Sequence, residues 1–147
     1  MSVGRTELLA FRVGDALHAL PLAAVTEVVK PPAISAVPFT PPWVAGVMWL
    51  RGALVPVFRV SRLLGAADTP DSPARRVLIA PRPGDRGHAV GLLVDEVLEV
   101  VAVAPEDVEP APGAGEVVAH ATRGGRRFAV LDERRLAGAA PALERAG

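Results

Sequence analysis

The stretch that decides the fold is Gly14-Asp15-Ala16-Leu17-His18-Ala19-Leu20-Pro21-Leu22, because the chain repeats its pattern as Gly84-Asp85-Arg86-Gly87-His88-Ala89-Val90-Gly91-Leu92. Each copy leads into a second shared stretch, Thr26-Glu27-Val28-Val29 after the first and Leu98-Glu99-Val100-Val101 after the second. The order of the segments is repeated as well as their residues. The sequence therefore predicts an internal duplication.

An Arg-Gly turn interrupts apolar sequence downstream of each copy, at Arg51-Gly52 and at Arg123-Gly124. Similar segments close the two halves, Val57 to Leu63 in the first and Val130 to Leu136 in the second. Neither half gathers the nucleophile, base and orienting group that an active site needs. We therefore expect a non-catalytic adaptor whose two lobes present contact surface, rather than an enzyme.

A loop separates the two halves, since residues 66–74 are rich in Asp and Pro. The length of 147 residues suits one domain with a sizeable core. We expect a single domain over residues 1–147, with lobe one at about 8–65, a linker at about 66–74, lobe two at about 75–137 and a C-terminal tail at 138–147.

The composition favours a cytoplasmic protein. The absence of cysteine excludes disulfides and thiolate metal sites and fits a reducing compartment. No run reaches the roughly twenty apolar residues of a membrane span, since Arg51 and Arg59 interrupt the stretch from Val44 to Val60. Met1 to Ala10 lacks the basic flank and long apolar core of a secretory signal.

Sixteen basic and sixteen acidic residues cancel, which leaves little general attraction for nucleic acid. The distribution is uneven, because every charged residue from Ala89 to Ala119 is acidic and arginines cluster from Arg123 to Arg135. A small β-barrel that binds nucleic acid through this basic face is an alternative from a different class. Aromatic residues for base stacking are almost absent apart from Phe128, which favours a surface of salt bridges.

Alternation and turn signals predict short strands in the first half. Glu7 to Val13 and Leu17 to Leu20 suit a hairpin around Gly14-Asp15. Leu22 to Val25 suits one helical turn that leads into the β-branched run from Glu27 to Val29.

A second hairpin is expected from Ala45 to Leu50 and from Leu54 to Phe58, around Arg51-Gly52. Both legs are apolar enough to be buried on two sides, and they are the best candidate for the core of the first lobe. Val60 to Leu64 suits a short helix that ends at Gly65.

The second half repeats this plan. The expected elements are strands at 76–80, 89–94, 97–103, 116–121 and 127–131, turns at Pro83-Gly84-Asp85 and from Pro105, and a helix capped by Asp132 that runs through Leu136. About five short strands per half predict an all-β fold of two small closed barrels, which leaves few exposed sheet edges.

We expect no metal and no cofactor. His18 and His88 hold equivalent repeat positions in different halves, and His120 has no companion at ligand spacing. The acid pairs Asp95-Glu96 and Glu106-Asp107 have no base nearby, and we expect them to be solvated. A small hydrolase built on these pairs is the least supported alternative.

One long stretch resembles a known family. Pro42-Trp43-Val44-Ala45-Gly46-Val47-Met48-Trp49-Leu50-Arg51-Gly52-Ala53-Leu54-Val55-Pro56-Val57 resembles the most recognisable segment of CheW-like chemotaxis coupling proteins. Phe11 to Gly14, Val25 to Val28, Val90 to Val97 and Pro105 to Pro110 also resemble this family. The similarity extends over nearly the whole chain, from about Leu8 to Leu136.

The resemblance implies two five-stranded SH3-like β-barrels around a shared core, and a scaffold role in chemosensory signal transduction. Members of the family connect the cytoplasmic tip of methyl-accepting chemoreceptors to the regulatory domain of the histidine kinase CheA. These two proteins are therefore the expected partners, with no membrane insertion and no nucleic acid. The expected location is the cytoplasm, at membrane-associated receptor arrays. A divergent paralogue that serves a non-flagellar pathway is the nearest alternative.

The resemblance also implies where the partners bind. One partner-contacting segment of the family falls on Val25 to Val28 and the other on Gly46 to Gly52, while the receptor hairpin docks in a groove between the lobes. The expected partner-binding residues are Val25, Glu27, Val28, Gly46, Trp49, Arg51, Gly52, Val97 and Val100.

Three places depart from the family's pattern and bear on partner choice. Trp49 stands where the family usually has Asn, and Arg59 stands where it usually has Asp, which inverts a charge. Ala119 to Arg123 replaces a glycine-bearing strand before the second turn.

Two side chains have both a structural and a functional interpretation. Arg51 pairs either with a partner's carboxylate or with carbonyl groups of its own barrel. Trp49 is either an interface anchor or a core residue, with the core favoured, and Trp43 is expected to pack.

Overall fold

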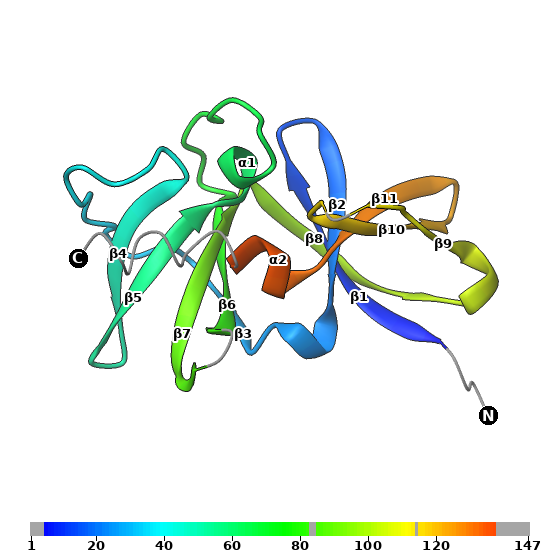
Figure 1. Cartoon of the computed structure of the whole chain (residues 1–147), viewed down its shortest axis with the longest axis horizontal. Coiled ribbons are helices and arrows are strands. Elements are labelled where there is room, and N and C mark those ends of the chain that lie inside the picture. The colour runs from blue at the N-terminus through cyan, green and yellow to red at the C-terminus, as the bar shows by residue number, and fades with distance from the viewer. Residues whose placement is uncertain (1–4, 83–84, 114, 138–147) are drawn as a thin grey trace.

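The computed structural model describes residues 5–82, 85–113 and 115–137, and it is built mainly of strands (Figure 1). The expected tail at 138–147 and part of the expected turn at 83–85 lie outside these residues. The first half forms β1 (Thr6–Val13), β2 (Ala16–Pro21), η1 (Leu22–Ala24), β3 (Glu27–Val29), β4 (Val44–Leu50), β5 (Ala53–Arg59) and α1 (Val60–Leu63). The second half forms β6 (Arg76–Arg82), β7 (Asp85–Val94), β8 (Glu96–Val103), η2 (Pro105–Asp107), β9 (Val108–Pro110), β10 (Val117–Arg123), β11 (Arg126–Leu131) and α2 (Glu133–Ala137).

Local signals placed most of these elements correctly. The hairpin around Gly14-Asp15, the helical turn after Pro21 and the short helix before Gly65 all form where they were expected. Asp132 caps α2, because its Oδ1 accepts a hydrogen bond from the Arg134 N–H at 2.8 Å. Within the described residues, no helix is both long and apolar enough to cross a bilayer.

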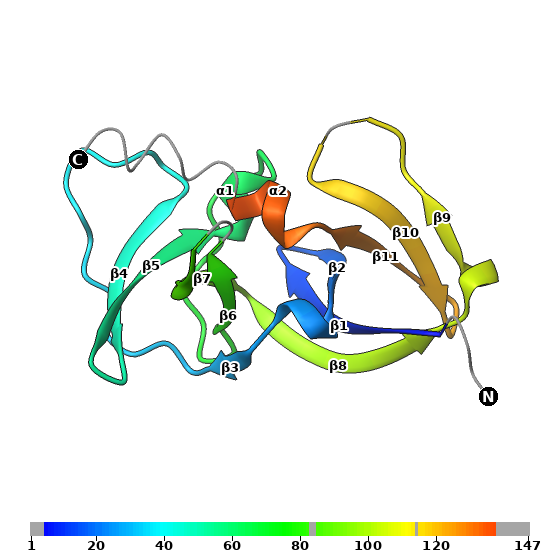
Figure 2. The same ribbon diagram turned by 60° about the horizontal axis from the view of Figure 1, so that its bottom comes forward.

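The strands make two sheets, one in each lobe, which confirms the all-β fold class. One sheet has the order β8-β1-β2-β11-β10-β9, and the other has the order β3-β6-β7-β5-β4. The lobes lie side by side, and Figure 2 shows β3 and β8 along the same lower side of the molecule. When β1, β2, β8, β10 and β11 are matched to β6, β7, β3, β4 and β5, the two sheets have the same order. The predicted duplication is therefore present in the fold.

Each sheet takes strands from both expected lobes, 8–65 and 75–137, because the two halves exchange their first hairpins. The hairpin of β1 and β2 lies in one sheet with strands β8, β9, β10 and β11 of the second half. The hairpin of β6 and β7 lies in the other sheet with strands β3, β4 and β5 of the first half. Each exchanged hairpin is hydrogen-bonded to its new sheet by a parallel pairing, of β2 with β11 and of β7 with β5. Alternation along a strand determines which side is buried but not which strand lies beside it. The repeat alone therefore did not reveal the exchange.

A shared apolar core joins the lobes. Phe11 and Leu20 of one sheet pack in the same cluster as Phe58 and Leu92 of the other. Trp43 lies against this cluster with its ring edge-on to Phe58 and the ring centroids 5.2 Å apart, which confirms its packing role. Because both sheets contribute to one core, the lobes are held in a fixed arrangement.

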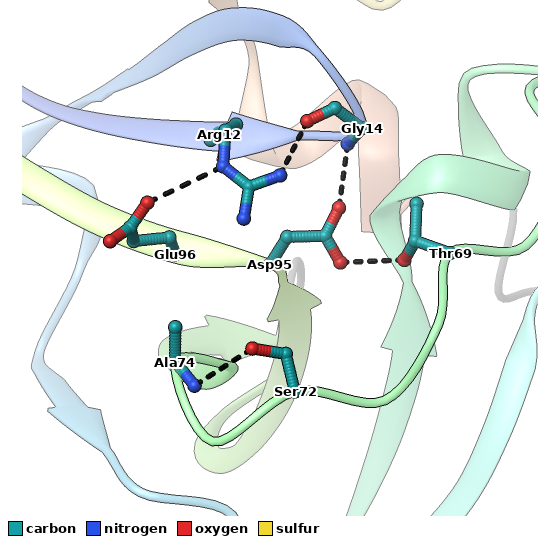
Figure 3. A network of polar contacts seen from close by, with 7 residues as sticks. All are labelled: Arg12, Gly14, Thr69, Ser72, Ala74, Asp95 and Glu96. Carbon is teal, nitrogen blue, oxygen red and sulfur yellow. Dashed lines mark hydrogen bonds and ion pairs between the residues drawn. The ribbon is translucent and has the colours of Figure 1, made fainter.

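Asp95 ties the linker between the halves to the first hairpin (Figure 3). It is only 5% exposed, and its carboxylate accepts hydrogen bonds from the Gly14 N–H at 2.6 Å and the Thr69 hydroxyl at 2.5 Å. The expectation that Asp95 is solvated is therefore wrong, because donors from two distant segments replace water around its charge. The neighbouring Glu96 instead reaches Arg12 at 3.4 Å in a half-exposed position.

Candidate protein interaction surface

The tip of the β4–β5 hairpin holds Arg51 in an unusual backbone conformation. Leu50 pairs with Ala53, which leaves Arg51 and Gly52 as a two-residue turn. Their φ angles are 47° and 79°, the combination of a type I′ turn, whose twist matches that of the flanking strands. Glycine adopts a positive φ at no steric cost, whereas arginine rarely does. The expected turn is confirmed, with Arg51 at its exposed tip.

Arg51 forms an ion pair with Glu27 of β3. Its Nη2 lies 2.6 Å from Oε2 of Glu27, and its Nη1 contacts Oε1, so the two planar groups meet through two hydrogen bonds. These bonds, with a smaller contribution from charge attraction, hold the pKa of the Glu27 carboxyl below its ordinary value. The Arg51 side chain remains 70% exposed. Its partner is thus a carboxylate of its own lobe, a pairing that nothing in the local sequence indicated.

This ion pair spans the place where the five-stranded sheet closes on itself. β3 and β4 are the two outer strands of that sheet. The chain after β3 also bridges to β4, since Ser35 and Val47 exchange backbone hydrogen bonds of 2.9 Å in both directions. Glu27 and Arg51 therefore add a side-chain link to the closure of the barrel.

Gly46 makes this closure possible. Its φ is 143°, and a Cβ atom at this position would lie 2.2 Å from the carbonyl oxygen of Ser35. No side chain fits there without moving the backbone. Gly46 is buried, so among the expected binding residues it shapes the surface and does not form it.

Trp49 and Leu54 form an exposed apolar pair beside the turn. They are direct partners in the β4–β5 ladder, and they are 67% and 53% exposed. The expectation that Trp49 packs in the core is wrong, because the preceding Met48 points inward and successive strand residues point to opposite faces. Sequence reasoning missed Leu54, although counting outward from the two-residue turn identifies it as the partner of Trp49.

The expected residues of β3 and β8 divide between surface and core. Val28 is 40% exposed on the outer face of β3. Val100 is 48% exposed on β8. Val25 and Val97 are instead half-buried and pack against the shared core. Only Val28 and Val100 of these four therefore offer substantial contact area.

The six-stranded lobe has a counterpart of the Glu27–Arg51 arrangement. Glu99 holds the repeat position of Glu27 and accepts a hydrogen bond from Arg126 at 3.0 Å. Val100, which follows Glu99, holds the repeat position of Val28. Each lobe thus has a Glu–Arg pair with an exposed valine adjacent to the glutamate.

Three of the arginines between Arg123 and Arg135, namely Arg126, Arg127 and Arg135, contact acids or carbonyl groups. Arg127 lies 4.0 Å from Glu109, and Arg135 Nη1 donates a hydrogen bond to the Gly115 carbonyl at 2.7 Å. Such contacts favour the interpretation of this region as a surface of salt bridges over its interpretation as a nucleic-acid-binding face.

His18 packs against an aromatic ring. Its ring lies nearly parallel to that of Phe11, with the centroids 6.0 Å apart. Burial lowers the pKa of His18 because the imidazolium loses hydration. Over the described part of the chain, no three acidic or histidine side chains converge as a metal ion requires.

Comparison with known proteins agrees with this architecture. Residues 7–140 match the CheW-like domain family. The probable chemotaxis protein CheW of Rhizobium etli is 35% identical over 112 residues, which cover 76% of this chain and 70% of that protein. The chemotaxis protein CheW of Rhizobium meliloti is 37% identical over 109 residues, which cover 74% and 68%. The crystal structure of the scaffolding protein TtCheW from Thermoanaerobacter tengcongensis superposes with a TM-score of 0.80 at 26% identity, covering 89% of this chain and 91% of that one.

The duplicated β fold and these comparisons together define a signalling adaptor of two SH3-like lobes. The chain belongs to the CheW-like family. It is a scaffold of chemosensory signal transduction.

Proposed function

We propose that the chain bridges the cytoplasmic tip of a methyl-accepting chemoreceptor and the regulatory domain of a CheA-type histidine kinase, and that it catalyses no reaction itself. Membership of the CheW-like family supports this role. The observation that carries the binding mode is the ion pair between Glu27 of β3 and Arg51, which is exposed at the tip of the hairpin that carries Trp49 and Leu54. Cytoplasmic location and recruitment to receptor arrays follow from these partners.

Exposure divides the expected binding residues into two groups. The contact group has side chains that are open to solvent, and it consists of Val28, Trp49, Arg51 and Val100, with Leu54 added. The supporting group fixes the shape of the surface or the direction of the contact side chains, and it consists of Val25, Glu27, Gly46, Gly52 and Val97.

The hairpin tip has the composition of an interface centre. Tryptophan and arginine dominate the binding energy of protein interfaces when partners exclude water from them. Glu27 restrains the long side chain of Arg51 before a partner arrives, which lowers the conformational entropy lost on binding. The charges of Arg51 and Glu27 lie beside the apolar area of Trp49 and Leu54 and limit its extent.

Equilibrium affinities of the full chain for the cognate kinase regulatory domain and for a receptor-tip fragment test this proposal. We expect Arg51→Ala and Val28→Asp each to weaken the affinity for at least one partner by about tenfold or more. Their circular dichroism spectra and melting temperatures should stay close to those of the wild type, because both side chains are solvent-exposed.

Arg123→Ala is the matched control. Arg123 is the last residue of β10, directly before the Gly124-Gly125 turn that corresponds to Arg51-Gly52, and the described residues give it no acidic partner. We expect this variant to bind both partners within about twofold of the wild type. Wild-type affinity of Arg51→Ala and Val28→Asp for both partners would overturn the proposed binding surface.

A further inference from the structure

A pocket with two arginines lies between the Pro-rich segment after β3 and the linker before β6. Its volume is about 440 Å³, which is large enough for several side-chain atoms. Ile34, Ala45 and Leu93 contribute apolar wall, and Arg59 and Arg75 contribute charge. The pocket contains none of the residues expected to bind partners, so it is separate from the hairpin surface.

Arg75 lines this pocket with unused hydrogen-bonding capacity. Its side chain is only 13% exposed, and its Nε is buried without an acceptor among the described residues. Its Nη1 contacts the carboxylate of Asp71, which is itself 94% exposed. A buried N–H group without an acceptor is destabilising. Asp71 thus satisfies only part of the Arg75 guanidinium.

Arg59 brings a second guanidinium group that forms no direct hydrogen bond to an acid. The Nε of Arg59 is 4.0 Å from Oδ1 of Asp68, and Arg62 shares the same oxygen at 3.8 Å. Both distances exceed the length of a hydrogen bond. With Arg75 and Asp71 included, this region has three bases facing two acids. Arg59 thus contributes positive charge that no acid balances at hydrogen-bond distance.

We propose that this pocket receives an acidic side chain of a partner protein, a carboxylate on a short apolar stem such as that of glutamate. The guanidinium groups of Arg59 and Arg75 match the planar carboxylate and take up its charge. Ile34, Ala45 and Leu93 pack against the methylene groups of the stem. Arg59 is then a determinant of partner choice, since an acidic side chain at this position would repel the same carboxylate.

Nuclear magnetic resonance of the full chain, labelled with ¹⁵N, tests the pocket directly. The probes are a capped glutamate (N-acetyl-glutamate N-methylamide), its uncharged glutamine analogue and inorganic phosphate. We expect the capped glutamate to shift the Arg75 Nε–H signal and the Ala45 amide signal saturably, with a Kd on the order of 1 mM. The glutamine analogue and phosphate should each bind at least about tenfold more weakly, since one lacks the charge and the other lacks the apolar stem.

Arg59→Asp and Arg62→Asp change the charge by the same amount, so their comparison provides the control. Arg59→Asp should weaken capped-glutamate binding by at least about tenfold, and the milder Arg59→Gln should weaken it in the same direction. Arg62→Asp alters the same contact with Asp68 but lies outside the pocket wall, and it should stay within about twofold of the wild type. Circular dichroism verifies that each variant is folded.

The proposal is overturned if capped glutamate gives no saturable shift, if the glutamine analogue or phosphate binds as tightly, or if Arg62→Asp weakens binding as much as Arg59→Asp. These measurements involve neither the kinase nor the receptor. If they contradict the pocket proposal, the adaptor proposal is unaffected. If the binding experiments contradict the adaptor proposal, the pocket proposal is unaffected.

Discussion

Glu27 and Glu99 occupy the same position of the two repeats, and each accepts hydrogen bonds from an arginine of a hairpin in its own lobe. Glu27 is bonded to Arg51 through both carboxylate oxygens, whereas Glu99 receives one hydrogen bond from Arg126. The duplication has thus produced two similar surfaces, of which the Glu27 surface has the larger number of Glu–Arg hydrogen bonds. We expect the Glu27–Arg51 surface to be the better organised of the two before binding.

The Glu27–Arg51 pair makes stability depend on pH in the acid range. The pKa of Glu27 is held below its ordinary value of 4.5 by the hydrogen bonds from Arg51. The contribution of the pair is therefore fully present above about pH 4.5 and is lost as the pH falls through the lower pKa of the folded state. In urea unfolding, the difference in the free energy of unfolding between wild type and Glu27→Gln should become smaller from about pH 6 to about pH 3. A difference in unfolding free energy that stays constant over this range would show that ionisation of the Glu27 carboxylate does not cause it.

Replacement of Gly46 should disrupt the barrel seam. An added Cβ meets the Ser35 carbonyl oxygen at 2.2 Å, and the φ of 143° disfavours any side chain. We expect Gly46→Ala to lower the free energy of unfolding by about 3 kcal/mol. Gly124→Ala is the control, because Gly124 also has a positive φ but has open space around it, and its cost should be about 1 kcal/mol. Equal losses in chemical denaturation would mean that the approach of Ser35 to β4 is unimportant.

The two tryptophans should separate stability from binding. Trp43→Ala removes an edge-on contact with Phe58 and should cost about 3 kcal/mol of unfolding free energy. Trp49→Ala removes an exposed ring and should change stability by no more than about 0.5 kcal/mol. The same Trp49 variant should weaken partner binding by about tenfold or more. A large loss of stability in Trp49→Ala, measured by calorimetry, would place this side chain in the fold and not at an interface.

The buried carboxylate of Asp95 should hold the linker in place. Asp95→Ala leaves the Gly14 N–H without its acceptor and releases Thr69, and we expect a loss of about 2 kcal/mol. Amide hydrogen exchange should accelerate at Gly14 and through residues 66–74. Glu96→Ala, next in the chain and half-exposed, should cost no more than about 0.5 kcal/mol. If exchange in the linker is the same in both variants, Asp95 does not restrain it.

Sequence patterns located the hairpins well because their turns have strong local signals. Gly14-Asp15 and Arg51-Gly52 lie between apolar runs, and both turns form as expected. The orientation of Trp49 was not predictable in the same way. Its neighbours from Val47 to Leu50 are all apolar, so alternation gives no contrast between the inner and outer faces.

Local sequence patterns could not predict the contacts between distant segments. The exchange of hairpins, the Glu27–Arg51 pair and the burial of Asp95 each depend on which strands become neighbours in space. Alternation specifies a buried face but leaves the neighbouring strand undetermined. For Glu27, resemblance to a family predicts a position near a partner surface, while only the fold identified Arg51 as its counterpart.

The claim that one chain links two proteins is tested most directly by sedimentation of the full chain mixed with the cognate kinase regulatory domain and a receptor-tip fragment. The account predicts a single heavier species that contains all three components, and it predicts that Arg51→Ala reduces this species. Mutually exclusive binding, in which the receptor fragment displaces the kinase domain, would contradict it.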